Sequence, residues 1–382
     1  MREYLLVLLV AAAVTFLASG VCRRIALRTG ALAQVRDRDV HTVAMPYFGG
    51  VAMFFGVLAA VLLAWQLPFL GRQVLVQQDS LAVLIAAAVI CAVGVLDDLY
   101  DLSALTKFAG QVLAAGIVVA LGVWMLWIPL PGQLVSLDFG ASVAITVFFI
   151  VLCSNAVNFV DGLDGLATGV VGIGAFAFFT YTYFYTVSQG LTRATTSSLI
   201  SVVILGVCLG FLPHNFFPAR MFMGDSGSML LGLLLATSTV SLTGQLDPSQ
   251  IGSDRGLVPT ILPLVLPLAI LALPFLDLVL AFVRRTYAGK WWFLPDKQHL
   301  HHRLLQRGHS QRRAVLLMYV WSGLVSFGVI GLGLVHGSRQ WTVAGVVAVL
   351  ALVLLLITLG RRPVRSVEAA GEPGRAGVAL RD

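Results

Sequence analysis

Eleven long apolar segments, separated by short polar stretches, are the feature that most restricts how this chain can fold. A helix needs about 20 mostly apolar residues to cross a bilayer, and most of the segments approach that length. They span residues 5–21, 50–65, 81–96, 108–127, 141–154, 166–185, 198–211, 228–242, 257–283, 314–335 and 341–359. Only 11% of the residues are charged, against about 25% in soluble domains. The sequence therefore predicts an all-α, polytopic integral membrane protein with about 11 transmembrane helices, the two shortest of which extend into their polar flanks.

The distribution of basic residues predicts the orientation of these helices. With the N-terminus outside, 20 of the 25 Lys and Arg residues fall on the inner side, which is the side that positively charged loops prefer. We therefore expect the N-terminus outside and the C-terminus in the cytoplasm. The net charge of +7 then follows from topology and attraction to anionic membrane lipid, and no nucleic-acid partner is expected.

A single transmembrane domain is expected over residues 1–360, followed by a disordered cytoplasmic tail over 361–382 that is rich in Gly and Pro. The polar residues of the transmembrane domain gather in predicted cytoplasmic loops. These loops are residues 22–49, 97–107, 155–165, 212–227 and 284–313.

Acidic residues cluster at three of the predicted cytoplasmic helix ends. The clusters contain Asp97, Asp98 and Asp101, then Asp161 and Asp164, and finally Asp225. Adjacent carboxylates repel one another and are costly at a membrane boundary, so they need a cation or a protonated partner. A helix cap explains one Asp but not a run of three, so a functional role is favoured.

The stretch around the second cluster is rich in oxygen donors. Asn155 and Asn158 are three residues apart, as are Asp161 and Asp164, so one helical turn would place each pair on one face. Carboxylate and amide oxygens suit Mg²⁺, which is commonly shared with substrate phosphates, and Mn²⁺ is an alternative ion. A calcium-binding loop is not supported, because the acidic ladder with a terminal Glu is absent.

Asp225 lies in the sequence Gly-Asp-Ser-Gly-Ser over residues 224–228, directly before an apolar segment. This pattern is typical of a helix N-cap, and the same geometry aims backbone N–H groups at an anion. Lys107, at the start of another apolar segment, is either a snorkelling side chain or a phosphate contact. Residues 46–50, Pro-Tyr-Phe-Gly-Gly, indicate a fixed bend and close packing of the next helix.

Three histidines lie within four residues of the last basic loop, next to an arginine. They are His299, His301, His302 and the adjacent Arg303. Zinc binding is not favoured, because no cysteine accompanies them and the spacing differs from the i, i+4 pair of a helical zinc site. Imidazole groups beside a guanidinium suit phosphate and sugar hydroxyls better.

Four motifs together resemble the polyprenyl-phosphate N-acetylhexosamine-1-phosphate transferases, and they occur in the order of that family. They are Asp97-Asp98-x-x-Asp101-Leu-Ser-x-x-x-Lys107-Phe, Asn155-x-x-Asn158-Phe-x-Asp161-Gly-x-Asp164-Gly, Pro218-Ala-x-x-Phe-Met-Gly224-Asp225-x-Gly227-Ser228, and His299-Leu-His301-His302-Arg303. The histidine motif and the eleventh helix resemble the branch that uses UDP-N-acetylglucosamine. Tyr47 departs from the pattern, since many members carry Arg there.

The resemblance implies a reaction at the cytoplasmic face of a bacterial cell membrane. N-acetylglucosamine 1-phosphate would pass from UDP-N-acetylglucosamine to undecaprenyl phosphate, releasing UMP and forming the first lipid-linked intermediate of a cell-envelope polysaccharide. A homodimer is one candidate assembly.

The resemblance also implies residue roles. By motif position, Asn158 and Asp225 would bind Mg²⁺, and Lys107 would bind the diphosphate. Asp97 would deprotonate the lipid phosphate, beside the further catalytic residues Asp98, Asp161 and Asp164. Asn155, His299, His301, His302 and Arg303 would bind the nucleotide-sugar.

Other functions remain open from the sequence. The same reaction could use another UDP-N-acetylhexosamine or UDP-MurNAc-pentapeptide, and a glycosyltransferase that moves only the sugar would release UDP. An ion-coupled transporter is the alternative from another class. It is disfavoured because transporter sites lie near the bilayer midplane, whereas these acidic residues cluster at predicted helix ends.

Overall fold

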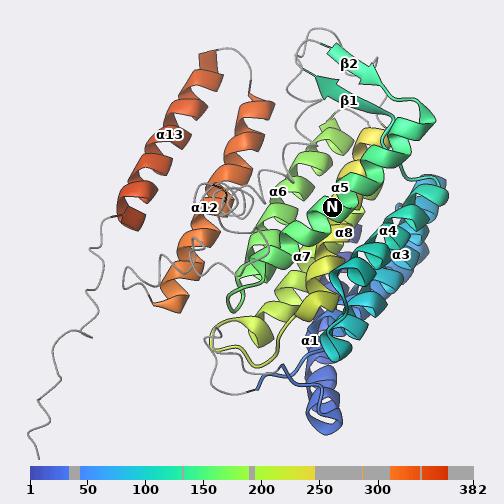
Figure 1. Ribbon diagram of the computed structural model, residues 1–382. Helices are drawn as coiled ribbons and strands as arrows, with labels where there is room; N and C mark the ends of the chain where they lie inside the picture. The colour runs from blue at the N-terminus through green and yellow to red at the C-terminus, as the bar shows by residue number, and fades with distance from the viewer. Residues whose placement is uncertain are drawn as a thin grey trace, which may run out of the picture.

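The computed structural model describes residues 1–33, 44–130, 133–188, 194–245, 286, 310–335 and 338–359. In these residues the chain forms a helical bundle with one β-hairpin (Figure 1). The elements are α1 (Arg2–Thr29), α2 (Gly49–Gln66), α3 (Val74–Tyr100), α4 (Ala104–Ala120), β1 (Trp127–Leu130), β2 (Gln133–Ser136), α5 (Phe139–Val160), α6 (Leu166–Ser188), α7 (Thr195–Asn215), α8 (Gly224–Gln245), α12 (Gln311–Leu334) and α13 (Ser338–Leu359).

The all-α, polytopic membrane architecture predicted from the sequence is confirmed. Among the described residues, nine helices are long and apolar enough to cross a membrane, and α4 is a shorter apolar helix. Ten of the eleven predicted segments overlap a described helix. The segment 257–283, most of the loop 284–313 and the tail 361–382 lie outside the described residues. The total of 11 helices and their orientation in the membrane therefore remain predictions.

The helix boundaries differ from the predicted ones in two ways. The segment 108–127 is too long at its end, because α4 stops at Ala120 and the left-handed Gly122 (φ 100°) redirects the chain into the β1–β2 hairpin. Trp127 pairs with Ser136 in that hairpin. Conversely, α5 and α7 are longer than the apolar runs 141–154 and 198–211, as was expected for these two short segments.

The predicted cytoplasmic loops are correspondingly too wide. Asp97 and Asp98 lie within the last turn of α3, Lys107 lies within α4, and Asn155 and Asn158 lie within α5. These polar side chains are accommodated in helices because each has a partner on a neighbouring helix. Hydropathy along one segment does not reveal such partners.

Helix α8 is the centre of the bundle, buried between α2, α3, α5 and α7. Glycines permit its close approach to the surrounding helices. A Cβ at Gly232 of α8 would lie 2.4 Å from the Cα of Ser154 on α5, and a Cβ at Gly94 of α3 would lie 2.3 Å from the Cα of Ser226 on α8. Small residues at such contacts are typical of packed membrane helices.

Replacing Gly94 by Ala is expected to destabilise the protein, because the added methyl group would overlap the backbone of α8 rather than a flexible side chain. Overpacking of this kind costs about 1–3 kcal/mol. The measurement is the apparent melting temperature of the purified, detergent-solubilised protein. Gly116→Ala on α4 is the matched control, because a Cβ at Gly116 meets nothing within 4 Å. An equal melting temperature for both variants would contradict the close contact.

The connections bring the three acidic clusters to one end of the bundle, opposite the β-hairpin (Figure 1). Helices α3, α5 and α7 end there, and α4, α6 and α8 begin there. The first residues of α2 hold the segment that precedes α8, since the N–H groups of Gly49 and Gly50 donate to the carbonyl oxygens of Phe222 and Met223 at 3.2 and 3.0 Å. The close packing predicted for residues 46–50 is thus confirmed.

Candidate active site

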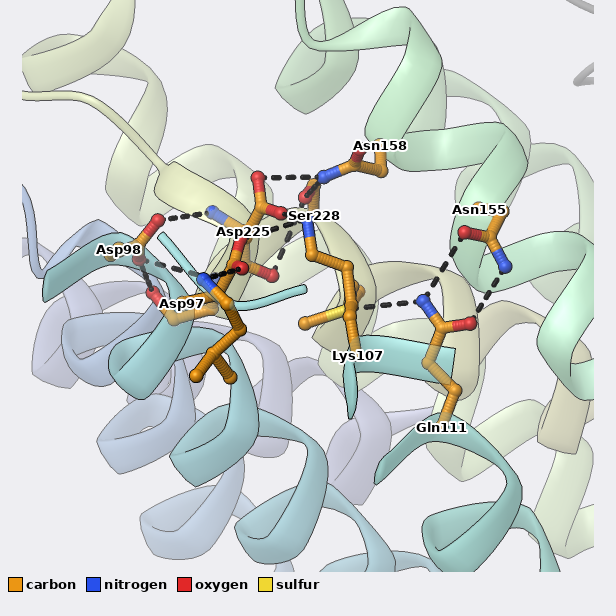
Figure 2. Close-up of polar contacts among 11 residues, drawn as sticks. Asp97, Asp98, Lys107, Gln111, Asn155, Asn158, Asp225 and Ser228 are labelled. Carbon is orange, nitrogen blue, oxygen red and sulfur yellow. Dashed lines mark hydrogen bonds and ion pairs between the residues drawn. The ribbon is translucent and has the colours of Figure 1, made fainter. Parts of the chain in front are cut away.

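Lys107 lies between two carboxylates from different helices, at the end of the bundle where the acidic clusters meet (Figure 2). Its Nζ is 2.7 Å from Oδ2 of Asp97 on α3 and also contacts Oδ2 of Asp225 on α8. The second oxygen of Asp97 accepts a hydrogen bond from the N–H of Leu102 at 3.1 Å. The side chains of Lys107 and Asp225 are each 25% exposed, so a ligand can reach this ion-pair cluster.

Asn158 joins α5 to the same cluster. Its Nδ2 donates to Oδ1 of Asp225 at 2.8 Å and to Oγ of Ser228 at 2.9 Å. Within the described residues, the Oδ1 atom of Asn158 accepts no hydrogen bond. The two residues predicted to bind a metal are therefore direct neighbours, although they come from segments 67 residues apart.

Asp98 points away from Lys107 and into the start of α8 (Figure 2). Its Oδ1 accepts the N–H of Asp225 at 2.7 Å, and its Oδ2 accepts the hydroxyl of Ser226 at 2.9 Å and the N–H of Ser226 at 3.3 Å. The neighbouring residues Asp97 and Asp98 thus make different contacts, one with a cation and the other with a helix N-terminus.

Gln111 and Asn155 form a reciprocal pair of amide hydrogen bonds between α4 and α5. Asn155 Nδ2 donates to Gln111 Oε1 at 2.7 Å, and Gln111 Nε2 donates to Asn155 Oδ1 at 3.3 Å and to the sulfur of Met229 on α8 at 3.2 Å. Gln111 is buried and lies one helical turn after Lys107. The pair therefore holds the face of α4 that carries Lys107 against α5 and α8. Gln111 was not among the site residues predicted from the sequence, although its i+4 spacing from Lys107 was an available signal.

Asp161 and Asp164 do not share a helical face, contrary to the expectation for this pair. Helix α5 ends at Val160, Asp161 is its C-cap, and the chain turns before α6 begins. The buried Asp164 accepts a hydrogen bond at Oδ2 from the N–H of Ala219 at 3.0 Å. Its carboxylate thereby anchors the connection between α7 and α8.

A second anchor of that connection, the buried Asn215 at the end of α7, was also missed by the sequence analysis. Its Oδ1 accepts the N–H of Gly165 at 3.1 Å and the hydroxyl of Thr168 at 2.8 Å, and its Nδ2 donates to the carbonyl of Met221 at 3.2 Å. Asn215 thus links α7 to the start of α6 and to the segment that precedes Asp225.

Asp161 is a carboxyl group whose environment favours the protonated form. Burial, together with the carboxylates of Asp225, Asp98 and Asp164, raises its pKa to about 7. Within the described part of the chain, no hydrogen bond to its carboxylate offsets this effect. The described residues of the site thus include more carboxyl groups than the single ammonium group of Lys107 can pair with.

Replacing Asp161 by Asn is expected to raise the apparent melting temperature at pH 8 more than at pH 5, measured with EDTA present. The pKa of this carboxyl group is about 4 in the unfolded chain and about 7 in the folded protein. Between these two pH values the unfolded chain ionises while the folded state disfavours ionisation, so the stability of the protein falls as the pH rises. The Asn side chain avoids that loss. A stabilisation of equal size at both pH values would contradict the shift.

The structure brings together five of the predicted site residues, namely Asp97, Asp98, Lys107, Asn158 and Asp225 (Figure 2). Asn155 and Asp161 border this group, and Asp164 faces the α7–α8 connection. The predicted nucleotide-sugar residues His299, His301, His302 and Arg303 lie outside the described residues.

Comparison with known proteins identifies relatives over nearly the whole chain. Residues 80–243, which include the Lys107 cluster, match the family described as Glycosyl transferase family 4. The chain is 46% identical to a decaprenyl-phosphate N-acetylglucosaminephosphotransferase of Mycolicibacterium smegmatis, with 95% of this chain and 90% of that protein covered. It is 48% identical to a protein of the same name from Mycobacterium tuberculosis, covering 86% and 82% of the two chains. It is 34% identical to a probable undecaprenyl-phosphate N-acetylglucosaminyl 1-phosphate transferase of Bacillus subtilis, covering 81% and 79%.

Proposed function

Because this chain belongs to glycosyl transferase family 4, we propose that it transfers N-acetylglucosamine 1-phosphate from UDP-N-acetylglucosamine to a polyprenyl phosphate, releasing UMP. The family membership that the motifs predicted is confirmed, and the chain is a multi-pass membrane phosphotransferase. The observation that best supports the specific reaction is the Asp97–Lys107–Asp225–Asn158 cluster at one end of the bundle. We place this end at the cytoplasmic face of a bacterial membrane, where the nucleotide-sugar is available.

The charges of the cluster suit a reaction between two anions. A lipid phosphate must approach a negatively charged diphosphate, and phosphoryl transfer depends mainly on positioning and electrostatic stabilisation. Lys107 supplies a fixed ammonium group, which the carboxylates of Asp97 and Asp225 hold at the site. Its role is to bind the diphosphate, while Gln111 keeps its helix in place.

Mg²⁺ is the cofactor that these donors fit, and Asp225 and Asn158 would hold it. The described site contains an excess of carboxylates over its ammonium group, so a further cation is needed when anionic substrates enter. Within the described residues, no group of three His, Cys, Asp or Glu side chains could hold a metal. Mg²⁺ often uses one or two carboxylates, with substrate phosphates and water completing its coordination. When bound, it neutralises the diphosphate charge and polarises the reacting phosphoryl group. Mn²⁺ takes similar ligands.

Asp97 is proposed to position Lys107 rather than to act as a strong base. A phosphate monoester has its second pKa near about 6, so most of the lipid phosphate is already a dianion at neutral pH. Both oxygens of Asp97 are engaged, one with Lys107 and the other with the N–H of Leu102. These contacts restrict proton transfer from the lipid phosphate to the carboxylate of Asp97.

Replacing Asp97 by Asn is therefore expected to lower the rate by the same factor at every pH from 6.5 to 9. The amide has no charge with which to hold Lys107, and that defect does not depend on solution pH. The measurement is initial UMP release by both proteins at saturating substrate across this range. A loss that shrinks towards alkaline pH would instead indicate that Asp97 deprotonates the acceptor.

The acceptor is proposed to be a C50 or C55 polyprenyl phosphate. The motif resemblance implied undecaprenyl phosphate. The mycobacterial relatives at 46% and 48% identity are named for decaprenyl phosphate, whereas the Bacillus relative at 34% is named for undecaprenyl phosphate. We therefore expect decaprenyl phosphate to be used at least as well. Parallel kcat/KM measurements with the two lipids test this preference.

Nucleotide release by the purified, detergent-solubilised protein tests the proposed reaction. With Mg²⁺, UDP-N-acetylglucosamine and the lipid phosphate, we expect UMP, and only when the lipid is present. UDP would instead show sugar transfer alone. Absence of release with each UDP-N-acetylhexosamine and with UDP-MurNAc-pentapeptide would contradict the proposal and favour the transporter.

A further inference from the structure

Asp98 occupies the place that a capping residue normally takes at the start of a helix. The first N–H groups of an α-helix have no partners within the helix, and they are usually bound by the side chain of the residue directly before it. In α8, the N–H groups of Asp225 and Ser226 are bound by Asp98, which lies on α3 and is 127 residues earlier in the chain. The cap of α8 is thus supplied by another helix.

The two helices are shaped for this contact. Gly224 has a φ of +69°, and a Cβ there would lie 2.4 Å from Oδ2 of Asp98. Gly94, one turn before Asp98, lets the backbone of α3 approach Ser226, and Gly50 lets α2 approach the N–H of Gly227. The Asp98 carboxylate is therefore enclosed against the first turn of α8.

We propose that Asp98 is a positioning residue, which caps α8 from α3 and thereby fixes the carboxylate of Asp225. Its carboxylate binds the backbone N–H of Asp225 itself, while Asn158 and Lys107 bind the side chain of that residue. A shift of the first turn of α8 would move Asp225 away from both partners.

This assignment replaces two sequence-based expectations. The N–H groups at the start of α8 were candidates for a ligand anion, and the structure gives them the protein's own carboxylate instead. Asp98 was grouped with Asp97 as a catalytic residue, yet both of its oxygens face the start of α8. The kinetic consequence rests on the proposed transferase function, whereas the capping contact does not.

Comparison of Asp98→Asn with Asp98→Ala is the kinetic test. Asn retains an oxygen for the N–H of Asp225 and can donate its amide to Ser226 Oγ, so it should keep UMP release within about tenfold of the unsubstituted protein. Ala removes every contact and should lower release by about 100-fold or more. Equal losses in the two variants would overturn the proposal, because a general base or a charged metal ligand needs the carboxylate itself.

A thermal double-mutant cycle tests the contact without using activity. We expect Asp98→Asn and Ser226→Ala each to lower the apparent melting temperature, and the double variant to lose less than the sum, because Asn replaces the charge-assisted hydrogen bond between these two side chains by a weaker neutral one. Additive losses would overturn the coupling. These two substitutions also keep the proposal testable if Asp98→Ala fails to fold.

Asp138→Ala is the matched control for both measurements. Asp138 caps α5 by accepting the N–H of Gly140 at 3.1 Å, at the end of the bundle remote from Lys107. Its removal should lower the melting temperature slightly and leave UMP release unchanged. If the unsubstituted protein releases no UMP, the transferase proposal fails, and the thermal cycle still decides whether Asp98 caps α8.

Discussion

Replacing Asp225 by Asn is expected to slow UMP release about 10³-fold while the protein remains folded. The substitution preserves size but removes the charge that holds Lys107 and that would bind Mg²⁺ together with Asn158. Loss of a single electrostatic stabiliser commonly costs about 10²–10³ in kcat, and loss of a metal ligand adds to that effect. Fold retention is expected because the backbone N–H of residue 225 still donates to Asp98.

The measurement for Asp225→Asn is the initial rate of UMP release at saturating substrates over a series of Mg²⁺ concentrations. Higher Mg²⁺ should recover part of the lost rate if the substitution weakens metal binding. Asp138→Asn, which removes an exposed carboxylate far from the site, should retain full activity. A loss of less than tenfold at every Mg²⁺ concentration would exclude Asp225 as a metal ligand.

Replacing Lys107 by Met is the second substitution for which a large effect is expected, about 100-fold or more in UMP release. Met preserves an unbranched apolar stem but removes the ammonium group that Asp97 and Asp225 share. Lys107→Arg should recover only part of the activity, because the planar guanidinium group is a poor substitute for a compact ammonium group. Activity of the Met variant within threefold of the original would contradict the proposed role.

The same Lys107→Met variant should also be less stable in EDTA. Without the ammonium group, the carboxylates of Asp97 and Asp225 face one another with no described cation between them, and like charges at short range repel. Mg²⁺ should restore part of the melting temperature, and Lys107→Met combined with Asp97→Asn should restore part of it without metal. Arg339→Met on the exposed surface of α13 is the control, with no change expected.

The sequence predicted the helices well because each long apolar run requires burial in lipid or protein. The ends of the helices were less predictable, since Asp97 and Asn158 are polar and were assigned to loops. Their partners, Lys107 and Asp225, come from other helices, and hydropathy along one segment cannot reveal such pairs.

The membership of the candidate site was predictable from motif residues, but the contacts of individual side chains were not. Asp97 and Asp98 are adjacent and chemically identical, yet one binds an ammonium group and the other caps a helix. Successive residues of a helix point in different directions, so the side chains of Asp97 and Asp98 reach different partners. Gly94 also allows the close approach of α3 to α8. Gln111 and Asn215 were overlooked because an amide in a sequence does not reveal its partners on other helices. The i+4 spacing of Gln111 from Lys107 indicates only that the two residues share a face of α4.

The central position of α8 also sets an order of assembly. This helix is less apolar than α1, and all of its membrane-spanning window is covered by protein rather than by lipid. Its hydroxyl-bearing side chains, including Ser238 and Thr239, are buried against the neighbouring helices. The surrounding helices must therefore receive it as the bundle closes, and Asp225 acquires its partners in that same event. A half-assembled chain would lack the Asp97–Lys107–Asp225–Asn158 cluster, on which the proposed transfer depends.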